Sequence, residues 1–344
     1  MQKLISSTLS KVVIDKDLDD SIKELDNKVF IIDKNVYNLF KEKLDLLKQN
    51  SPFYLFEAEE SKKTLSEVET IYGFFIKNIV TRNTVIVGIG GGIATDIAAF
   101  AASTFKRGCR LQLIPTTFLG MIDAAIGGKT AVNYNGIKNN IGTFYPAEKV
   151  IVDTRFLDSL SKKEIQNGWT ECLKVALIEN GELLEILLKE KNKITEEIIT
   201  KAIKIKLSIC EKDMDDKNER KLLNLGHTFG HVLESISDYQ ISHGEAVAIG
   251  IRVAAYISNK LGYLNKNDLE KINDLLNLYN LPTRISASYM NKMKKHGLNI
   301  LLKDKKATFK LNVIFFEGFQ KAFIKQVDEP KEIFDLFVQY LSKK

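Results

Sequence analysis

The sequence contains few cysteines and no arrangement of them that suggests a covalent framework. Cys109, Cys172 and Cys210 are odd in number, lie far apart and include no CxxC pair. Disulfide scaffolds need closely spaced pairs in a secreted chain, so that class is excluded and a reducing cytosol is expected. Residues 1–9 also lack a basic segment followed by an apolar stretch, so we expect no secretory signal peptide.

Long apolar runs and basic segments with interleaved aromatic residues are also missing. Arg252 interrupts the apolar stretch from Ala246 to Ile257, so we expect no membrane-spanning segment. Without a basic, aromatic-containing segment we expect no nucleic-acid binding. The net charge of +6, from 50 basic and 44 acidic residues, fits either a solvated lysine-rich surface or a local basic pocket for an anionic substrate. The total charge does not separate these two interpretations.

The first half of the chain alternates short apolar runs with helical patterns. Buried strands are predicted at residues 29–32, 84–87, 111–114 and 150–152, and helices at residues 35–48 and 65–80. This alternation is typical of a parallel sheet with helices on both faces. We therefore predict an α/β domain over residues 1–157.

The second half is dominated by helical periodicity. Ser161-Lys162-Lys163-Glu164 has the spacing of a capping box and opens a helical stretch. Beyond it, Pro282 and Pro330 are the only prolines. We therefore predict an all-α domain over residues 158–344. A β-rich segment from Phe309 to Phe316 is the alternative for part of its end.

A glycine-rich turn follows the strand predicted at residues 84–87. Gly90, Gly91 and Gly92 are consecutive, and an alanine-rich helical stretch follows at residues 97–105. Such glycines let the backbone approach a bulky ligand, and the next helix N-terminus offers free N–H groups to a pyrophosphate. The turn differs from the usual G-x-G-x-x-G fingerprint, and a tight turn without a ligand is the alternative.

Histidine is scarce, yet three of the four histidines lie close together. His227, His231 and His243 fall within 17 residues, whereas His296 stands alone in a lysine-rich stretch and is expected at the surface. Clustered histidines with nearby carboxylates suit a divalent metal such as zinc. By spacing alone, His227 and His231 share a helix face and could ligate that metal. Histidines that hydrogen-bond between packed helices are the alternative.

Two lysine-containing motifs follow the strand predicted at residues 111–114. Gly127-Gly128-Lys129-Thr130 and Lys138-Asn139-Asn140 lie on a polar stretch. Ligands of parallel sheets bind beyond the strands' carboxyl ends, where lysines can hold a phosphate as point charges. The alternative is an ordinary solvated loop.

Taken together, these segments resemble the 3-dehydroquinate synthases, which belong to the sugar-phosphate cyclases. The resemblance runs from Glu57 to Leu261. The motifs that carry it, in order, are Gly90–Asp96 (GGG-x-x-x-D), Lys106-Arg107-Gly108, Pro115-Thr116-Thr117, Asp123, Gly127–Thr130 (GGKT), Lys138-Asn139, Glu171 with Lys174, Lys206, Arg220, Asn224–His231 and His243-Gly244-Glu245. Their order and spacing match the family.

The resemblance implies a Rossmann-like NAD-binding domain over residues 1–157 and a helical metal- and substrate-binding domain over residues 158–344. It implies a zinc or cobalt ion held by Glu171, His227 and His243, which displaces the pairing of His227 with His231 and leaves coordination positions open. His231 then resembles the acid–base residue, and Asp123 the acidic partner that orients the substrate hydroxyls. The other substrate-contacting residues implied are Lys129, Asn139, Lys174, Lys206, Arg220 and Asn224.

The resemblance also implies NAD contacts. They involve Gly92, Ile93, Ala94, Thr95, Asp96, Thr116, Thr117, Lys129, Lys138, Phe156, Leu157, Asp158 and Ser159, with Asp33, Asn35, Glu59 and Lys62 at the adenosine end. The family usually has glycine at the positions of Thr95 and Ala99. We expect the Thr95 side chain to point away from the pyrophosphate and to cap the following helix.

The implied substrate is 3-deoxy-D-arabino-heptulosonate 7-phosphate, whose carboxylate and phosphate match a cluster of Lys, Arg and Asn side chains. In the family, NAD transiently oxidises one hydroxyl, phosphate leaves by β-elimination, the ketone is reduced again, and an intramolecular aldol step gives 3-dehydroquinate for the shikimate pathway. NAD is therefore regenerated, and the net reaction is that of a lyase.

The resemblance further implies a homodimer in which Arg107 crosses the interface to the substrate phosphate of the neighbouring subunit. From its position alone, Arg107 is a surface arginine that closes a helix C-terminus. Lys305 and Lys306 resemble a family loop near the substrate.

Three other functions are weighed against this one. A cyclase that forms a valiolone or an inosose would differ within the GGKT stretch and at Arg220 and Asn224. A metal-dependent polyol dehydrogenase would share the glycine turn but would have no use for Lys174, Lys206 and Arg220 together. A non-catalytic binding protein would not need the complete ligand set.

Overall fold

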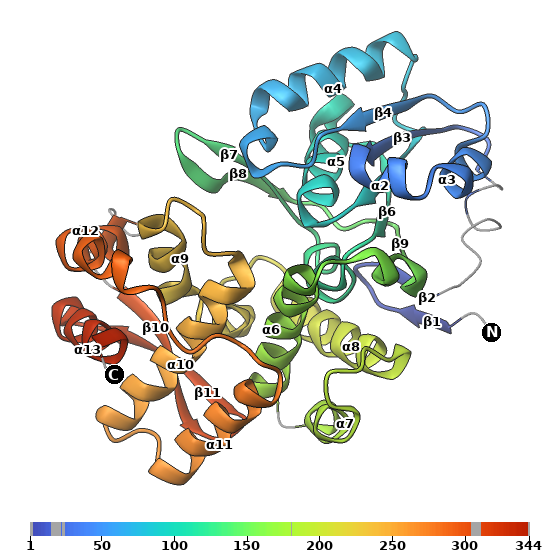
Figure 1. The fold of residues 1–344 in the computed structure, drawn as a ribbon. Helices are drawn as coiled ribbons and strands as arrows, with labels where there is room; N and C mark the ends of the chain where they lie inside the picture. Colours follow the sequence, from blue (N-terminus) through green and yellow to red (C-terminus); the bar gives the residue numbers. More distant parts are fainter. Residues whose placement is uncertain (1–2, 15–21, 23–24, 180, 304–310, 343–344) are drawn as a thin grey trace. The chain divides into compact units, whose positions relative to one another are not determined.

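The computed structural model of the protein describes residues 3–14, 22, 25–179, 181–303 and 311–342, in two compact units (Figure 1). The first unit consists of Met1–Ile165 and Ile199–Asp215, and the second of Gln166–Ile198 and Asp216–Lys344. Most of helix α8 (Glu196–Lys212) thus belongs to the first unit. The domain boundary near residue 157 stays a prediction, and Lys305 and Lys306 lie outside the described residues.

A seven-stranded sheet forms the centre of the first unit. Its strand order is β1-β2-β9-β6-β5-β3-β4, and every neighbouring pair is parallel except β1 with β2. The strands are β1 (Lys3–Ser6), β2 (Lys11–Ile14), β3 (Lys28–Asp33), β4 (Phe53–Phe56), β5 (Val85–Gly90), β6 (Arg110–Pro115) and β9 (Lys149–Val152). The four predicted strands are confirmed as β3, β5, β6 and β9, and the parallel sheet with them.

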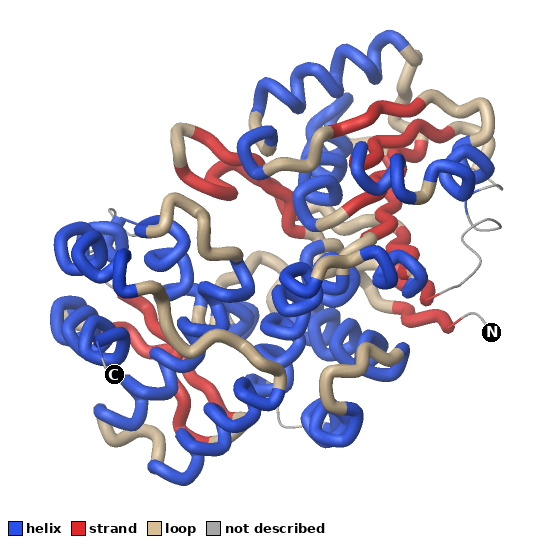
Figure 2. Tube along the Cα trace, viewed as in Figure 1, coloured by secondary structure: helices blue, strands red, loops and turns tan. Residues whose placement is uncertain are grey.

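Besides most of α8, this unit contains short helices and the longer helices α4 and α5, which Figure 2 draws among the helices. They are α2 (Lys34–Leu39), α3 (Lys41–Lys48), η1 (Glu60–Lys62), α4 (Leu65–Lys77), α5 (Gly92–Thr104), η2 (Phe105–Arg107), η3 (Gly120–Ala124) and η4 (Thr154–Ser159). The helix predicted at residues 35–48 is two helices, because Phe40 leaves the helical conformation and packs its ring edge-on against Phe156, with centroids 4.8 Å apart. Helix α5 packs on β5 and β6.

A separate hairpin contains the lysine motifs. Strands β7 (Lys129–Tyr134) and β8 (Ile137–Phe144) pair antiparallel around Asn135 and Gly136. Both turn residues have positive φ, 51° and 75°, as a two-residue type I′ turn requires. This stretch is therefore an ordered hairpin and not a solvated loop.

The second unit is mostly helical. Its helices are α6 (Lys162–Ile178, which begins in the first unit), α7 (Glu182–Glu190), η5 (Glu219–Asn224), α9 (His227–Ile236), α10 (His243–Lys260), α11 (Lys266–Leu278), η6 (Ala287–Tyr289), α12 (Met290–Lys303) and α13 (Pro330–Ser342). Helix α10 is buried over most of its length and packs against α9, α11 and α13, as expected for a helix that is apolar all round. The predicted capping box is confirmed, since Glu164 N donates to Ser161 Oγ at 3.3 Å and Ser161 N to Glu164 Oε2 at 2.9 Å.

The prediction that residues 158–344 are all-α is wrong in one part. Strands β10 (Leu311–Gly318) and β11 (Lys321–Val327) form an antiparallel hairpin, so the β alternative for this region is the better one. Phe315 and Phe316 are buried, and Phe316 N donates to Ser258 Oγ of α10 at 2.9 Å. The hairpin forms because α10 supplies an apolar surface against which its β-forming residues pack.

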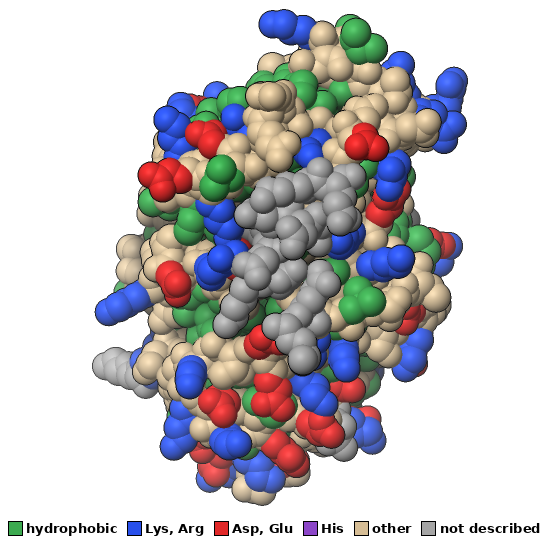
Figure 3. All heavy atoms as spheres, turned by 90° about the vertical axis from the view of Figure 1, so that its right-hand side faces the viewer, with side chains coloured by type: hydrophobic (Ala, Val, Ile, Leu, Met, Phe, Trp, Pro, Cys, Tyr) green, Lys and Arg blue, Asp and Glu red, His purple; other side chains and the backbone are tan. Residues whose placement is uncertain are grey.

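Within the described residues, no helix combines the length and apolar character needed to cross a membrane. On the face drawn in Figure 3, Lys and Arg side chains are interspersed with Asp and Glu side chains. This mixture of signs is typical of a solvated surface.

Candidate functional site

The first unit has a ligand-binding edge where its parallel strands end. Strand β3 ends at Asp33, β5 at Gly90 and β6 at Pro115, and Gly90 pairs with Pro115 in register. From β3 the chain continues to β4 on one side, and from β5 it continues to β6 on the other. The strand order therefore reverses between β3 and β5, and ligands of open α/β sheets bind at such a point.

The glycine turn lies at this edge. Gly90 has a φ of 151°, and a Cβ there would lie 2.6 Å from Ala94 Cβ and 2.8 Å from Asp33 Cβ. Gly91 is the N-cap of α5 and provides no side-chain cap, so the helix N-terminus keeps N–H groups for a phosphate. The predicted strand–turn–helix is confirmed, and residues 92–96 form the first turn of α5. Its NAD contacts stay a prediction.

Thr95 does not cap this helix, so that part of the expectation is wrong. Its Oγ1 donates to the carbonyl oxygens of Gly91 and Gly92, at 3.2 and 3.0 Å. The side chain is buried and bonded to the carbonyls of the turn that precedes it. A threonine is tolerated here because its hydroxyl finds acceptors within its own helix.

We expect Thr95→Gly to leave NAD affinity within about twofold of the parent value, because the hydroxyl is bonded to carbonyls and not to the N–H groups that meet a phosphate. The variant should lose about 1 kcal/mol of unfolding free energy, since glycine is flexible in a helix and a buried methyl is removed. Titration calorimetry with NAD tests this, with Thr95→Ser as the matched control. A large gain in affinity would show that Thr95 obstructs the cofactor.

Lys63 joins two of the predicted site residues, although it is not among the residues predicted from the sequence. Its buried Nζ lies 2.5 Å from Asp96 Oδ2 and 2.6 Å from Asn139 Oδ1. The neighbouring Glu59 and Lys62, which were predicted at the adenosine end, are exposed. Burial raises the pKa of Asp96, and the Lys63 ammonium opposes this rise. The sequence holds no signal for Lys63, because its partners are 33 and 76 residues away.

The hairpin residues around Asn139 are held by a second set of bonds. Asn139 has a positive φ of 52°, and its N–H donates to Asn133 Oδ1 at 2.9 Å. Asn133 Nδ2 in turn donates to Glu60 Oε1 at 2.7 Å. Lys129 starts β7, and Lys138 precedes Asn139 in β8. The hairpin thus presents these predicted residues from a fixed backbone.

Asp123 and Lys206 meet within the first unit. Lys206 extends from α8, and its Nζ contacts Asp123 Oδ1 and lies 2.6 Å from the Asp123 carbonyl oxygen. Just before η3, Thr116 N donates to Gly90 O at 2.9 Å, and Thr117 Oγ1 accepts from Gly120 N at 3.0 Å. The threonines are therefore bonded to the glycine turn and to the start of the helix that contains Asp123.

The segment from Phe156 to Ser159 forms η4 after β9. Phe156 is fully buried against Phe40, and its NAD contact stays a prediction. Buried Asp153 accepts from Arg155 N at 3.0 Å and from Lys43 Nζ. These bonds fix the start of the segment, whose later residues are more exposed.

Arg107 lies after α5 in an unusual backbone conformation. Lys106 and Arg107 have φ values of 50° and 62°, and both side chains are exposed. Non-glycine residues in the left-handed region are costly, and two other consecutive pairs occur in the part of the chain that the structure describes, at Lys191-Asn192 and Asp238-Tyr239. Among the described residues we find no hydrogen bond or ion pair of the Arg107 side chain.

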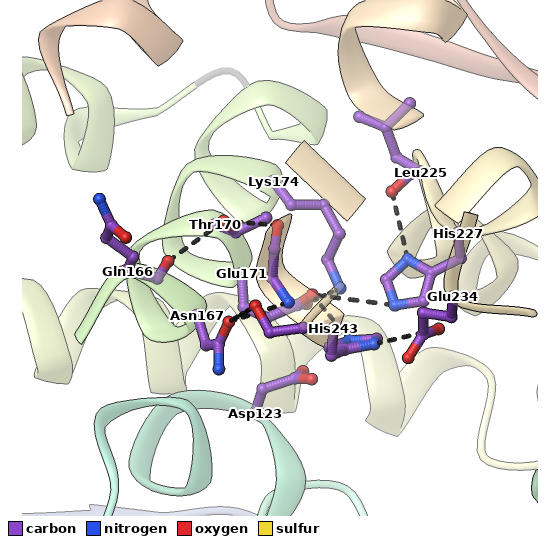
Figure 4. A network of polar contacts seen from close by, with 12 residues as sticks. Asp123, Gln166, Asn167, Thr170, Glu171, Lys174, Leu225, His227, Glu234 and His243 are labelled. Carbon is purple, nitrogen blue, oxygen red and sulfur yellow. Dashed lines mark hydrogen bonds and ion pairs between the residues drawn. The ribbon is translucent and has the colours of Figure 1, made fainter. Parts of the chain in front are cut away.

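The second unit contains a group of three metal-ligand side chains. Glu171 comes from α6, His227 from the start of α9 and His243 from the start of α10 (Figure 4). Their ligand atoms all lie within 4.8 Å of one another. Glu171 Oε1 is 3.8 Å from His227 Nε2 and 3.4 Å from His243 Nε2. These are the three residues that the resemblance selects.

The geometry of this group fits a zinc-like ion. Glu171 Oε1 is buried and has no hydrogen-bond partner among the described residues. A buried carboxylate oxygen without a hydrogen bond is costly, and a bound cation would compensate for the missing hydrogen bond. Ligands about 2.1 Å from one tetrahedral ion lie about 3.4 Å from each other, close to the separations here. Two histidines and one carboxylate also leave a coordination position open.

Burial and neighbouring charges shift the pKa values of all three side chains in this group. Burial, followed by the charge of Lys174, lowers the pKa of His227 to about 3, so this imidazole is neutral, as a ligand must be. Burial alone would raise the pKa of Glu171, but Lys174 and the two histidines hold it well below its usual range. Burial would also lower the pKa of His243, yet Glu171 and Glu234 outweigh it and raise that pKa to about 10. Unlike His227, His243 would therefore have to release a proton in order to ligate a metal ion.

Two further charged residues adjoin the group. Buried Lys174 contacts Glu171 Oε2 through its Nζ, so it holds the carboxylate by the oxygen other than Oε1, the one nearest to the histidines. Glu234 Oε2 lies 3.8 Å from His243 Nδ1, the nitrogen opposite the one that faces Glu171. Carboxylates in this place orient metal-bound histidines. Glu234 was not predicted, although it lies seven residues after His227 and so on the same helix face.

The other predicted residues of this unit lie on α9 and just before it. The His231 ring is exposed and stands edge-on to His227, with centroids 5.6 Å apart. Arg220 is buried and Asn224 half-buried within η5, which leads into α9. His231 is not one of the three clustered ligands, which leaves it available for another role.

Comparisons with known families identify both parts of the chain. The family model described as 3-dehydroquinate synthase N-terminal matches residues 53–167, and the model described as 3-dehydroquinate synthase C-terminal matches residues 168–307. The 3-dehydroquinate synthase of Saccharolobus solfataricus is 39% identical over 273 residues, which cover 77% of each chain. That of Pyrococcus furiosus is 38% identical over 295 residues, which cover 84% of this chain and 85% of the relative.

Solved structures with the same fold include two sugar-phosphate cyclases. A 2-deoxy-scyllo-inosose synthase complexed with carbaglucose-6-phosphate, NAD⁺ and Co²⁺ has a TM-score of 0.86 at 25% identity, covering 98% of this chain and 100% of that chain. A 2-epi-5-epi-valiolone synthase from Streptomyces hygroscopicus with NAD⁺ and Zn²⁺ has a TM-score of 0.85 at 26% identity, covering 98% of each chain. A glycerol dehydrogenase from Schizosaccharomyces pombe, 17% identical with a TM-score of 0.60, shares the fold alone.

Proposed function

The chain belongs to the 3-dehydroquinate synthase family, and we propose that Glu171, His227 and His243 hold the metal on which its reaction depends. The reaction converts 3-deoxy-D-arabino-heptulosonate 7-phosphate to 3-dehydroquinate and phosphate, and its cofactors are NAD and one divalent metal. The observation that carries the proposal is the buried Glu171 oxygen that has no hydrogen bond and faces two imidazole nitrogens. We propose classification as a carbon–oxygen lyase that acts on phosphate.

When bound, NAD would accept and return one hydride. The metal would polarise the oxygen of the substrate hydroxyl group whose carbon gives up that hydride. The residues around the ion determine how it is held. Lys174 contacts one oxygen of Glu171, which leaves the other oxygen to the ion. His227 is neutral because of its burial, so it offers a lone pair without first losing a proton.

We assign the substrate's negative groups to a set of cationic and amide side chains. The heptulosonate carboxylate and phosphate need charge-assisted hydrogen bonds. The residues proposed to provide them are Lys129, Asn139, Lys174, Lys206, Arg220 and Asn224. Arg220 and Lys206 are mostly buried, and charges removed from water bind an anion more strongly than exposed ones.

Two residues are proposed to handle protons and hydroxyls. His231 has an exposed ring next to His227 and is not needed as a ligand, so we assign it the acid–base role near the reacting carbon. Asp123 is held by Lys206 through both its side chain and its carbonyl oxygen, and we assign it the orientation of substrate hydroxyls.

The cofactor is proposed to bind at the carboxyl edge of the sheet. The pyrophosphate would meet the N-terminus of α5 at residues 92–96, with Asp33 and Asn35 toward the ribose and adenine. The Lys63 ammonium, between Asp96 and Asn139, would fix the side chains beside it. Function in a reducing cytosol is also proposed, since the three buried cysteines form no disulfide.

One assay tests the reaction as a whole. Phosphate release and product identity are measured from the heptulosonate substrate with purified protein, NAD and Zn²⁺ or Co²⁺. We expect equal amounts of phosphate and 3-dehydroquinate. A valiolone or inosose product from a different sugar phosphate, with no turnover of the heptulosonate, would assign the chain to another cyclase reaction.

NAD is expected to be required but not consumed, because the hydride removed in the oxidation returns before the product leaves. Turnover should therefore yield many product molecules for each NAD molecule supplied. Absorbance at the NADH wavelength, followed together with phosphate release, measures the ratio. NADH that accumulates in proportion to product would instead support a polyol dehydrogenase.

A further inference from the structure

His243 occupies a helix position that needs external support. It is the first residue of α10, where the backbone N–H groups have no partner within the helix. Ser242 and Glu245 form a capping box, in which Ser242 N donates to Glu245 Oε2 at 2.8 Å. Helix ends fray, however, and an imidazole that ligates a metal must be held within about 0.5 Å of its place.

That support comes from α6, the helix that contains Glu171. Asn167 Oδ1 accepts from Gly244 N at 3.1 Å and from Ser242 Oγ at 3.0 Å. Thr170 Oγ1 has two acceptors at 3.1 Å and shares its hydrogen between them: the carbonyl oxygen of Gly244 and that of Gln166 in its own helix. Both backbone polar groups of Gly244 therefore have partners among the side chains of α6.

The two helices are in direct contact at this point. A Cβ on Gly244 would lie 2.4 Å from the Cα of Asn167, so the backbones of α6 and α10 touch. Thr170 and Gly244 are buried, so no water can replace the bonds between them. Asn167, Thr170, Glu171 and Lys174 are spaced i, i+3, i+4 and i+7 and therefore share one face of α6.

We propose that Asn167 and Thr170 are positioning residues that fix His243 relative to Glu171 and thereby determine metal affinity. The inference rests on the proposed function, since it presupposes that these two ligands bind one ion. The two side chains bind the backbone on one flank of His243, while Glu234 faces the Nδ1 of its ring. Their loss would let the first turn of α10 move without removing any ligand.

The test compares Co²⁺ binding by the full-length, metal-stripped protein and its variants. Thr170→Val keeps the side-chain volume and removes the hydroxyl, and Asn167→Ala removes the acceptor. Each is expected to weaken Co²⁺ binding about 10- to 100-fold, the range for partners that orient metal ligands, and to change the visible Co²⁺ absorption spectrum. Thr170→Ser and Asn167→Asp keep the bonding atoms and should restore affinity and spectrum.

Ser258→Ala is the matched control for a general loss of stability. Ser258 is also buried in α10, where its hydroxyl donates to Ala254 O at 2.7 Å and accepts from Phe316 N at 2.9 Å. This variant should melt at a lower temperature but bind Co²⁺ as the parent does. An equal loss of affinity in Ser258→Ala, or parental affinity in both Thr170→Val and Asn167→Ala, would overturn the positioning role alone. Failure of the parent protein to bind Co²⁺ would overturn the proposed metal centre as well.

Discussion

The His243→Ala variant is expected to lose its bound metal and nearly all activity. His243 is one of the three proposed protein ligands, and Glu171 Oε1 lies 3.4 Å from its Nε2. Without this ligand the ion would keep one histidine and one carboxylate, too few for a stable catalytic site. Removal of partners that only orient ligands costs about 10- to 100-fold, so loss of a ligand should lower kcat/KM by more than about 100-fold.

Metal analysis and phosphate release measure the two effects separately. The parent protein should contain one Zn²⁺ or Co²⁺ per chain, and His243→Ala close to none. His296→Ala is the matched control, because that histidine is exposed on α12, away from the three ligands in the sequence. Full metal occupancy in His243→Ala would contradict the assignment of His243 as a metal ligand.

The glycine turn could be predicted because each of its parts has a local cause. The apolar run of β5 predicts a buried strand, and Gly90 stands where a Cβ would collide with Ala94 and Asp33. Local signals of this kind need no knowledge of the rest of the chain. The ligand of the turn could not be predicted from these signals, since a tight turn that binds no ligand would have the same sequence pattern.

The metal ligands show where spacing alone misleads. His227 and His231 have a ligand-like separation of four residues. The histidine that joins His227 and Glu171 in the clustered group is instead His243, the first residue of α10. Which side chains converge depends on how α6, α9 and α10 pack, and periodicity does not contain that information. The resemblance to a family supplied it instead.

Other residues were missed for physical reasons that can be named. Lys63 and Asn167 bind partners far along the chain, so nothing in their neighbourhoods marks them. The hairpin β7–β8 alternates weakly between polar and apolar residues, but Asn135-Gly136 is a strong turn signal that would have revealed it. The β10–β11 hairpin depends on burial against α10, a tertiary effect that overrides the helical pattern around it.

Arg107 is expected to complete the active site of a neighbouring subunit, so that two inactive variants restore activity when mixed. Its side chain is exposed, and Lys106 and Arg107 have left-handed backbone just after the end of α5. We propose a two-fold dimer in which this guanidinium binds the substrate phosphate across the interface. Arg107→Ala and His243→Ala should then each be nearly inactive alone.

The expected recovery follows from symmetry. When the two variants exchange subunits at random, about half of the dimers are mixed. In a mixed dimer, the site on the Arg107→Ala subunit keeps its metal ligands and receives an intact arginine from its partner, while the other site lacks both. Roughly a quarter of all sites should therefore recover, as measured by phosphate release.

Differently tagged subunits establish that exchange has occurred before activity is measured. Lys106→Ala is the matched control, because it removes a neighbouring exposed charge. This variant should be active without being mixed with a second variant. If exchange is complete and no activity returns, Arg107 contributes to the active site of its own subunit or to no active site. Recovery well above a quarter of the sites would mean that the His243→Ala subunit also contributes a working site, which contradicts its role as a ligand.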